Sequence, residues 1–399
     1  MTQSGATLPS VRLKPHGGKR LLRGHPWIYS NEIEMDREVK ALPAGGLVEL
    51  VGDDGHRLGV AMFNPQTLIS ARLFSRDPKA DIDQAFLAGR LRRALAIRER
   101  LIDAPCYRLI HAEADGLPGT VVDRFDDTLV VQVNSAGMER LTPPLLAALD
   151  EVVAPGRVVL RNDSPARAQE GLDSRVEVVK GRLEGPVELV ENGARFFADV
   201  IQGQKTGWFF DQRENRAWAS RLAGGARVLD CYAFTGGFGI AAALAGAGKV
   251  TLLDRSGPAL DLARQAAEAN GVAERCAYLK AEVFGELGHL AKSGESFEVV
   301  IADPPAFVKS KRELARGIKG YRKLARLAAA LVARDGFLVI ASCSHHVDAA
   351  SFAEQVRRGL MDAGREARLL RSAGAGADHP QHPALPESAY LKALFLALD

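Results

Sequence analysis

The sequence contains few cysteines and no cysteine pair with the spacing of a metal site. Its 399 residues include four cysteines, namely Cys106, Cys231, Cys276 and Cys343. Disulfide-stabilised secreted scaffolds and structural zinc modules need evenly paired or closely spaced cysteines, so neither class is expected. Unpaired thiols are typical of a reducing compartment, and we expect a cytoplasmic protein.

Long hydrophobic runs are also missing. No apolar stretch approaches the roughly 20 residues that a helix needs to cross a bilayer, and no charged-then-apolar leader opens the chain. The composition, 47% hydrophobic and 25% charged, is that of an ordinary globular protein. We therefore expect no membrane partner, and the length predicts two or three domains.

The net charge is close to zero, at +3, so the overall balance does not indicate a partner. The distribution of charge along the chain is more informative, because basic residues form two clusters with almost no acidic residues among them. The first cluster is Arg12, Lys14, Lys19, Arg20 and Arg23, and the second is Lys309, Lys311, Arg312, Arg316, Lys319, Arg322 and Lys323. Such clusters favour local recognition of a polyanion such as RNA, although solvated surface segments have the same pattern.

The periodicity changes along the chain. Residues 8–75 carry short strands and a Gly-Asp-Asp-Gly turn, which predicts a small β-barrel. An amphipathic helix over 83–102 and strands around a second helix at 138–152 predict an α+β part. A hairpin turns at Asn192-Gly193, and strands and helices alternate regularly beyond residue 226. We predict a multidomain α/β protein whose parts are residues 1–78, 79–185 and 186–399.

The most informative motif is ARVLDCYAFTGGFGI, at residues 226–240. A short apolar strand ends in Asp230, a glycine-containing loop follows, and an alanine-rich helix begins, as at the opening of a doubly wound α/β sheet. A second strand ends in Asp254, where an acid can accept hydrogen bonds from ribose hydroxyls. The loop lacks the G-x-G-x-x-G that a pyrophosphate needs, so a nucleoside ligand without phosphates is favoured. S-adenosylmethionine is the obvious candidate.

Two later strands end in motifs that suit chemistry on a base. One ends in Asp303-Pro304-Pro305-Ala306-Phe307, where two prolines stiffen the backbone into a wall. Phe307 suits stacking on a planar base, and Asp303 can hydrogen-bond the ring. The next strand ends in Ser342-Cys343-Ser344, which places a thiol among polar neighbours at the same expected edge.

A thiol at that edge suits methylation of a pyrimidine carbon. Carbon 5 of a pyrimidine is a poor nucleophile, but a thiolate that adds to carbon 6 makes it enamine-like. A protonated Asp303 near ring nitrogen 3 stabilises the adduct. We therefore predict Cys343 and Asp303 as catalytic residues. A lone cysteine more often only packs in the core, and we assign that role to Cys106 and Cys276.

With these motifs the chain resembles the bacterial RlmI-like family of 23S ribosomal RNA (cytosine-5-)-methyltransferases over essentially its whole length. The resemblance is carried by Gly24-His25-Pro26-Trp27-Ile28-Tyr29, by Phe210-Asp211-Gln212-Arg213, by the three strand-end motifs, and by a tail at 377–380 and 386–392. It implies an N-terminal PUA-like RNA-binding domain, a central α+β domain and a C-terminal Rossmann-like class I methyltransferase.

The resemblance also implies the site residues. The cofactor S-adenosylmethionine would be bound by Phe210, Asp211, Arg213, Asp230, Phe234, Thr235, Gly236, Asp254, Arg255, Ser256, Glu282 and Asp303. Large-subunit ribosomal RNA would be bound by Arg12, Lys14, Lys19, Arg20, Arg23, Lys309, Lys311 and Arg312. Glu282 stands where relatives usually have aspartate, and Pro305 stands where many RNA cytosine-5 enzymes have a second cysteine. The group that releases the adduct is therefore unidentified.

Other functions remain open from the sequence. The Asp-Pro-Pro-x-Phe motif also resembles signatures of enzymes that methylate nitrogen. A nicotinamide-dependent oxidoreductase shares the fold, and an RNA-binding protein with a vestigial cofactor site shares the motifs. We expect no metal, because His345, His346, His379 and His382 follow no ligand spacing. Neither the modified nucleotide nor the oligomeric state, a homodimer included, follows from one chain.

Overall fold

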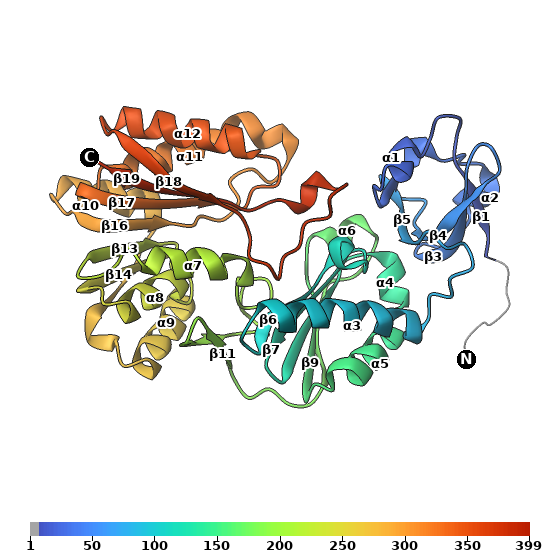
Figure 1. Cartoon of the computed structure of the whole chain (residues 1–399), viewed down its shortest axis with the longest axis horizontal. Helices are drawn as coiled ribbons and strands as arrows, with labels where there is room; N and C mark the ends of the chain where they lie inside the picture. The colour runs from blue at the N-terminus through green and yellow to red at the C-terminus, as the bar shows by residue number, and fades with distance from the viewer. Residues whose placement is uncertain (1–7) are drawn as a thin grey trace. The chain divides into compact units, whose positions relative to one another are not determined.

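The structure, a computed structural model that describes residues 8–399, divides into two compact units (Figure 1). The N-terminal unit contains residues 8–185 together with 200–207 and 377–388. The C-terminal unit contains residues 186–199, 208–376 and 389–399. No helix of the described chain combines the length and the apolar character needed to span a membrane.

The N-terminal unit begins with the expected β-barrel. In the described chain it is a five-stranded sheet in the order β1-β3-β4-β5-β2. β3 and β4 are joined by the predicted turn, where Gly55 takes a φ of 83° that a side chain would disfavour. Val48, Leu50 and Ala61 point into its core. The elements are β1 Ser10–Arg12, α1 Lys19–Leu22, β2 Trp27–Tyr29, η1 Ser30–Glu32, α2 Arg37–Lys40, β3 Gly46–Val51, β4 Arg57–Phe63 and β5 Ile69–Ser75.

A second five-stranded sheet follows, in the order β10-β9-β8-β7-β6. β8 and β9 are parallel and the other neighbours are antiparallel, so the predicted α+β part is confirmed. The predicted helix over 83–102 is α3, capped by Asp83, whose side chain accepts a hydrogen bond from the Phe86 amide at 2.8 Å. The elements are α3 Gln84–Leu101, β6 Cys106–His111, η2 Ala112–Asp115, β7 Thr120–Phe125, β8 Thr128–Val133, α4 Ala136–Arg140, α5 Thr142–Val153, β9 Arg157–Asn162, α6 Ala166–Gln169 and β10 Arg175–Lys180.

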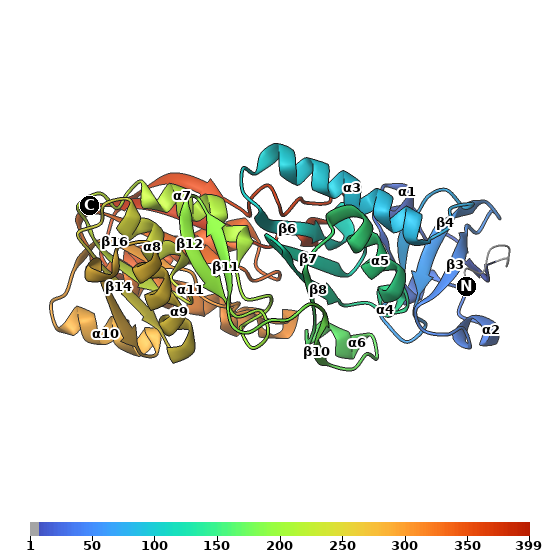
Figure 2. The ribbon, with the colours of Figure 1, turned by 90° about the horizontal axis from the view of Figure 1, so that it is seen from below.

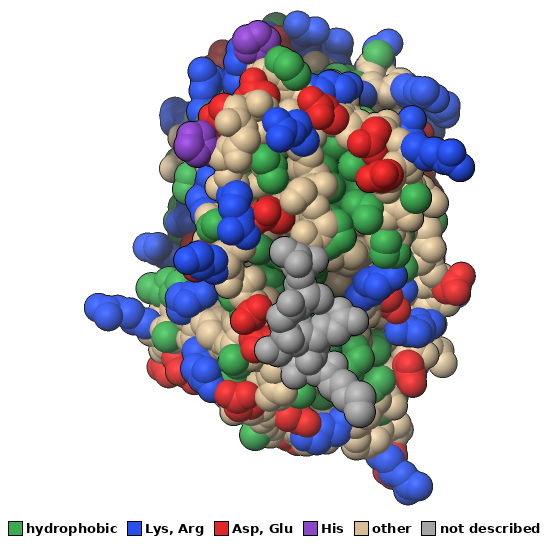
Figure 3. All heavy atoms as spheres, turned by 90° about the vertical axis from the view of Figure 1, so that its right-hand side faces the viewer, with side chains coloured by type: hydrophobic (Ala, Val, Ile, Leu, Met, Phe, Trp, Pro, Cys, Tyr) green, Lys and Arg blue, Asp and Glu red, His purple; other side chains and the backbone are tan. Residues whose placement is uncertain are grey.

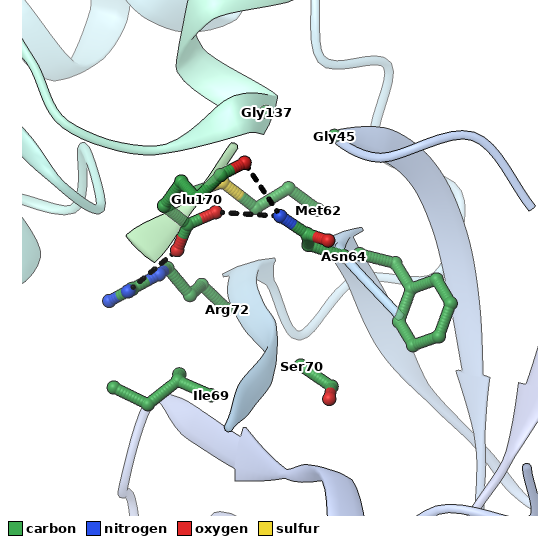
Figure 4. A pocket seen from close by; sticks show the side chains of 9 residues that line it. Gly45, Met62, Asn64, Ile69, Ser70, Arg72, Gly137 and Glu170 are labelled. Atoms are coloured by element: carbon green, nitrogen blue, oxygen red, sulfur yellow. Dashed lines mark hydrogen bonds and ion pairs between the residues drawn. The ribbon is translucent and has the colours of Figure 1, made fainter. Parts of the chain in front are cut away.

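A buried polar cluster joins the barrel to this second sheet, beside a small pocket (Figure 4). Glu170 accepts hydrogen bonds from Arg72 Nη2 at 3.1 Å and from Asn64 Nδ2 at 3.1 Å. The Ala136 amide donates to the same carboxylate at 3.3 Å, and Arg72 Nη1 reaches Glu113 Oε1 at 3.0 Å. Because these charges are paired, none of them is buried uncompensated. The barrel and the second part also share one hydrophobic core, which accounts for their forming one compact unit.

Two segments that are distant in sequence complete the N-terminal unit. Arg161 donates to the carbonyl oxygens of Val200 and Gly203, each at 2.9 Å. The carboxylate of Asp378 accepts from the Arg108 amide at 3.0 Å, and its carbonyl accepts from Arg98 Nη2 at 2.9 Å. Neither segment carries a sequence signal for this position. The second includes η6 Pro386–Ser388.

The C-terminal unit is built on a seven-stranded sheet in the order β15-β14-β13-β16-β17-β19-β18. β13 to β17 are parallel, and β19 is antiparallel to both of its neighbours. α11 and α12 cover one face and α8 and α9 the other (Figures 1 and 2). Burial on both faces explains the near-continuous apolar strands such as 297–302. The predicted doubly wound sheet is confirmed.

The bounds of the elements in this unit follow. They are β11 Val187–Glu191, β12 Ala194–Ala198, η3 Phe210–Gln212, α7 Arg213–Ser220, β13 Arg227–Cys231, α8 Gly237–Leu244, β14 Lys249–Asp254, α9 Gly257–Ala269, η4 Ala273–Arg275, β15 Cys276–Lys280, α10 Val283–Lys292, β16 Phe297–Ala302, η5 Lys311–Glu313, α11 Leu314–Ala329, β17 Val332–Ser342, α12 Ala349–Asp362, β18 Ala367–Ala373 and β19 Lys392–Leu398.

Candidate active site

Four neighbouring strands bring the candidate residues to one edge of the C-terminal sheet. Asp230 and Asp254 lie at the ends of β13 and β14, Asp303 follows β16, and Cys343 follows β17. Because these strands are parallel neighbours, their carboxyl ends share an edge. The strand order reverses between β13 and β16, which is where ligands bind in doubly wound sheets.

Asp230 is a buried carboxyl with other acids around it. It is 1% exposed and accepts a hydrogen bond from the Gly239 amide at 2.8 Å. Burial raises the pKa of Asp230 to about 8, and the charges of Asp303 and Asp254 also raise it, whereas the Gly239 hydrogen bond opposes the shift. Acids that disfavour one another's charge provide an environment in which a cation binds favourably.

The loop after β13 holds a strained backbone. Tyr232 and Phe234 have φ values of 61° and 51°, although neither is glycine, and Gly236 follows at 85°. Such conformations cost about 1 to 3 kcal/mol for each side-chain-bearing residue and cluster at functional sites. The Phe234 amide donates to Asp254 Oδ2 at 2.9 Å, which ties the strained loop to the end of β14.

Asp254 is oriented by the backbone around it. Its Oδ2 accepts from Phe234 and its Oδ1 accepts from the Ser256 amide at 2.8 Å. Each carboxylate oxygen retains a lone pair, so the group is able to accept hydrogen bonds from ribose hydroxyls. Ser256 caps α9 by accepting from the Ala259 amide at 3.3 Å, and Arg255 is exposed.

Two hydroxyls beside this loop are suited to a ligand. The Thr235 Oγ1 and Tyr232 OH groups are buried and have no hydrogen-bond partner among residues 8–399. An unsatisfied buried hydroxyl costs about 1 to 3 kcal/mol, and a ligand that bonds to it removes this cost. A Cβ atom on Gly239 would lie 3.0 Å from Asp230 Oδ2, so glycine is needed for the helix to approach the carboxyl. Carboxylates and hydroxyls together fit a nucleoside with a cationic tail.

The Asp303-Pro304-Pro305-Ala306-Phe307 motif lies beside the loop that follows β17. Its Phe307 is half-buried, and its ring centroid is 5.7 Å from that of Phe284 and 4.8 Å from that of Tyr321. Part of the ring is therefore packed against the protein's own core. Pro304 is buried and Pro305 is exposed, so the second proline forms the surface of the wall.

Cys343 lies directly against that wall. The residue is partly exposed, and its thiol donates to the carbonyl oxygen of Pro304 over a long distance of 3.9 Å. The following residue, Ser344, holds the turn in place, because its hydroxyl lies 2.7 Å from the Tyr321 hydroxyl and accepts from the Val308 amide at 3.2 Å. The two motifs predicted to act on a base are thus in contact.

The other three cysteines are unsuited to attack a base. Cys106 and Cys231 are buried, and burial raises the pKa of the Cys231 thiol well above its ordinary value. Cys276 begins β15, at the opposite end of the sheet from the site, and burial raises its pKa to about 11. Since the thiolate is the nucleophile, these shifts leave Cys343 as the candidate.

The remaining predicted cofactor residues also belong to the C-terminal unit, and each contacts other side chains or backbone groups of that unit. Phe210 is fully buried, and the Arg213 guanidinium is 5.6 Å from its ring centroid. Asp211 Oδ2 accepts from the Tyr390 hydroxyl at 2.5 Å. Glu282 is exposed and caps α10 by accepting from the Gly285 amide at 2.9 Å.

Sequence reasoning missed a buried ion pair that supports the strained loop. Glu191 is 1% exposed and accepts from Arg216 Nε at 2.6 Å. Arg216 also donates to the Phe209 carbonyl at 2.8 Å, and the Phe209 ring lies 5.2 Å from that of Phe234. The signal was available, because alternation along β11 places Glu191 on the buried face with Val187.

The two basic clusters lie in different units. The first, Arg12 to Arg23, is exposed on the barrel, where Arg20 pairs with Glu32 at 3.3 Å. On the face drawn in Figure 3, Lys and Arg side chains are interspersed with Asp and Glu. Lys309, Lys311 and Arg312 are exposed in the C-terminal unit, directly after the Asp303 motif.

The histidines lie in separate surroundings. His345 stacks on Tyr390 with centroids 5.0 Å apart, whereas His379 in the N-terminal unit bonds to Asp378 at 2.8 Å. Within residues 8–399 no group of three or more His, Cys, Asp or Glu side chains is placed to hold a metal ion.

Comparisons with known proteins agree with this geometry. The profile of the S-adenosylmethionine-dependent methyltransferases matches residues 155–397, and that of the PUA-like domain matches residues 11–76. A solved SAM-dependent methyltransferase from Streptococcus mutans has a TM-score of 0.83, at 20% identity, over 98% of this chain and 100% of that one. A methyltransferase solved in complex with SAH gives 0.84, with the same identity and coverage. The two profiles identify the PUA-like barrel and the Rossmann-like methyltransferase, and together with the fold of these neighbours they confirm the predicted fold class.

Curated relatives match over nearly the whole chain. The ribosomal RNA large subunit methyltransferase I of Aeromonas salmonicida is 38% identical over 94% of this chain and 96% of its own length. That of Photobacterium profundum is 39% identical over 96% and 98%. An oxidoreductase on the same fold is thereby excluded. The chain belongs to the S-adenosylmethionine-dependent methyltransferases, in the family of the ribosomal RNA large subunit methyltransferases I, and its cofactor is S-adenosylmethionine.

Proposed function

We propose that the protein methylates carbon 5 of a cytosine in large-subunit ribosomal RNA through a covalent adduct with Cys343. The main supporting observation is the position of Cys343, a partly exposed residue at the carboxyl edge of the sheet whose Sγ lies 3.9 Å from the Pro304 carbonyl oxygen. The substrate class is supported by the names of relatives that match nearly the whole chain.

The residues divide the chemistry between them. The Cys343 thiolate attacks carbon 6 of the base, and Asp303 hydrogen-bonds the ring and stabilises the adduct. S-adenosylmethionine supplies the electrophilic methyl group. We assign its sulfonium and ammonium charges to the acidic surroundings of Asp230 and its ribose to Asp254. The other cofactor contacts are assigned to Phe210, Asp211, Arg213, Phe234, Thr235, Gly236, Arg255, Ser256, Glu282 and Asp303.

RNA contact is assigned to both units. The PUA-like barrel, within residues 1–78, contributes the cluster Arg12, Lys14, Lys19, Arg20 and Arg23. The methyltransferase part, residues 186–399, contributes Lys309, Lys311 and Arg312 beside the site, and residues 79–185 form the central part. The target base must leave its stack to reach Cys343, which favours a single-stranded or loosened region of RNA.

Replacing Cys343 by alanine tests the proposal. We expect 5-methylcytidine to disappear from large-subunit RNA, measured by mass spectrometry of nucleosides after incubation with S-adenosylmethionine. The matched control is Cys276→Ala, which removes a thiol at the other end of the sheet and should leave the product unchanged. A Cys343→Ala enzyme that still methylates carbon 5 would contradict the covalent route.

Nitrogen methylation is the second candidate. It is favoured by Asp303-Pro304-Pro305-Ala306-Phe307, which resembles the signatures of enzymes that methylate amino or ring nitrogens. Under this alternative the product is an N-methylated nucleoside, and Cys343→Ala retains substantial activity. The same mass spectrometry separates the two products.

A further inference from the structure

Lys392 is a buried amine close to the candidate nucleophile in the sheet, at a position where no sequence pattern predicts a role. It is the first residue of β19 and pairs with Ser342 of β17 in the antiparallel register, next to Cys343. Lys392 is only 8% exposed. Its Nζ donates to the carbonyl oxygens of Ser344 and Tyr390, each at 2.7 Å. The Nζ atom therefore lies against the backbone of the residue that follows Cys343.

The two acceptors of Lys392 are neutral, so neither compensates a positive charge. Burial lowers the pKa of Lys392 to about 8, and the negative form of Cys343 opposes this shift more than Asp348 does. Asp348 is already engaged at the start of α12, where it accepts from the amide and the hydroxyl of Ser351 at 2.7 and 2.8 Å. The thiolate of Cys343 is thus the anion that best matches a Lys392 ammonium.

The hydrogen bonds of Lys392 are compatible with either protonation state. A neutral amine has two N–H groups, which satisfy the carbonyls of Ser344 and Tyr390, and its lone pair remains available. An ammonium keeps both bonds and adds a third proton. The gain of one proton by Lys392 therefore breaks neither of its own hydrogen bonds, and the contact that the transfer gives up is the long one from the Cys343 thiol to the Pro304 carbonyl.

We propose that Lys392 is a positioning residue that accepts the thiol proton of Cys343 and holds the resulting thiolate. The S–H bond breaks, an N–H bond forms on Nζ, and the electron pair stays on sulfur. Coupling between the two groups is reciprocal, so an anion that stabilises the ammonium is itself stabilised by it. This inference rests on the proposed function, because the covalent route is what requires a thiolate.

The other titratable groups near Lys392 have their own partners. Tyr321 contacts the Ser344 hydroxyl at 2.7 Å, and burial raises its pKa. His345 stacks on Tyr390, whose hydroxyl donates to Asp211. The Lys392 amine is tied to the turn carrying Cys343 by its hydrogen bond to the Ser344 carbonyl, and its second hydrogen bond goes to the Tyr390 carbonyl that precedes β19.

Alkylation of Cys343 by iodoacetamide as a function of pH tests the inference. The full-length, cofactor-free enzyme is pulse-labelled between pH 5 and 10, and the Cys343 peptide is quantified by mass spectrometry against the Cys276 peptide as internal reference. In wild type we expect a midpoint below about 8.5, the ordinary value for a thiol. Lys392→Met removes the charge at similar length and should raise the midpoint by about one unit, which slows labelling at pH 7 about tenfold. Lys392→Arg keeps the charge and should keep the midpoint low.

The outcomes separate the inference from the proposed function. A Lys392→Met profile that superimposes on wild type would overturn the role of Lys392, whatever the methylation assay of Cys343→Ala shows. Conversely, full activity of Cys343→Ala would contradict the covalent route. It would leave the result of the alkylation experiment on Cys343 and Lys392 unaffected. If thermal melting shows that Lys392→Met does not fold, the wild-type midpoint decides, and a value at or above that of an ordinary thiol rejects the inference.

Discussion

Replacing Asp230 by asparagine should stabilise the cofactor-free C-terminal unit and weaken cofactor binding. Asparagine has nearly the same shape, and its side-chain oxygen is able to accept the Gly239 amide that Asp230 now accepts at 2.8 Å. What the substitution removes is the ionisable proton of a carboxyl that is 1% exposed. Any pH dependence of the difference in free energy of unfolding between wild type and Asp230→Asn therefore reports on that proton.

The magnitude follows from the shifted ionisation. Burial, together with the charges of Asp303 and Asp254, raises the pKa of Asp230 from 3.8 to about 8. Between these values the folded chain holds a proton that the unfolded chain has released, so wild-type stability falls as pH rises. A shift of about four units corresponds to about 6 kcal/mol, at about 1.4 kcal/mol for each unit. The advantage of Asp230→Asn should grow from pH 4 to pH 8 and then level off.

Urea denaturation followed by tryptophan fluorescence measures this difference. Trp208 and Trp218 lie in the C-terminal unit and Trp27 lies in the N-terminal unit, so a Trp27→Phe background restricts the signal to unfolding of the C-terminal unit. The free energies of unfolding of wild type and Asp230→Asn are compared at each unit from pH 5 to pH 9. Curves that stay parallel across this range would refute the argument, because they would show that Asp230 ionises normally in the folded protein.

Cofactor binding should respond in the opposite direction. The positive charges of S-adenosylmethionine favour the Asp230 carboxylate, so wild-type affinity should rise as pH approaches 8, with proton release on binding. Isothermal titration in buffers of different ionisation enthalpy counts that proton. Asp230→Asn should bind about tenfold or more weakly, since it lacks a charged partner, and should release none. Equal affinity in both proteins would show that the positive charges of the cofactor do not interact with Asp230.

Three further substitutions test other parts of the site. Gly239→Ala places a Cβ atom 3.0 Å from Asp230 Oδ2, and overpacking should cost about 1 to 3 kcal/mol in chemical denaturation; a neutral result would show that α8 shifts freely. Glu191→Ala leaves Arg216 buried without its carboxylate and should cost about 3 to 5 kcal/mol, with Glu188→Ala on the exposed face as control. Joint replacement of Lys309, Lys311 and Arg312 by alanine should weaken RNA binding and reduce the slope of its salt dependence by up to about three counterions. An unchanged slope in a filter-binding titration would remove this cluster from the RNA path.

Much of the site could be predicted from local sequence. Asp230 and Asp254 lie at the ends of apolar strands, Asp303 and Cys343 directly follow two others, and parallel neighbours present their carboxyl ends at one edge. The chemistry of each residue type then indicates a cationic nucleoside and a thiol nucleophile. These inferences depended on local strand-end patterns and on the rule that doubly wound sheets bind ligands at the carboxyl ends of their strands.

Contacts between distant segments were decided by the tertiary structure alone. Lys392 reaches the turn of Cys343 only because β19 inserts antiparallel between β17 and β18. No local sequence pattern predicts this order of strands. Residues 377–388 likewise join the N-terminal unit through Arg98 and Arg108, more than 250 positions earlier in the chain. A single lysine or aspartate is not part of a periodic sequence pattern, so the sequence does not predict its partner. Local sequence determined which residues end the strands, and packing across the sheet determined which charges face them.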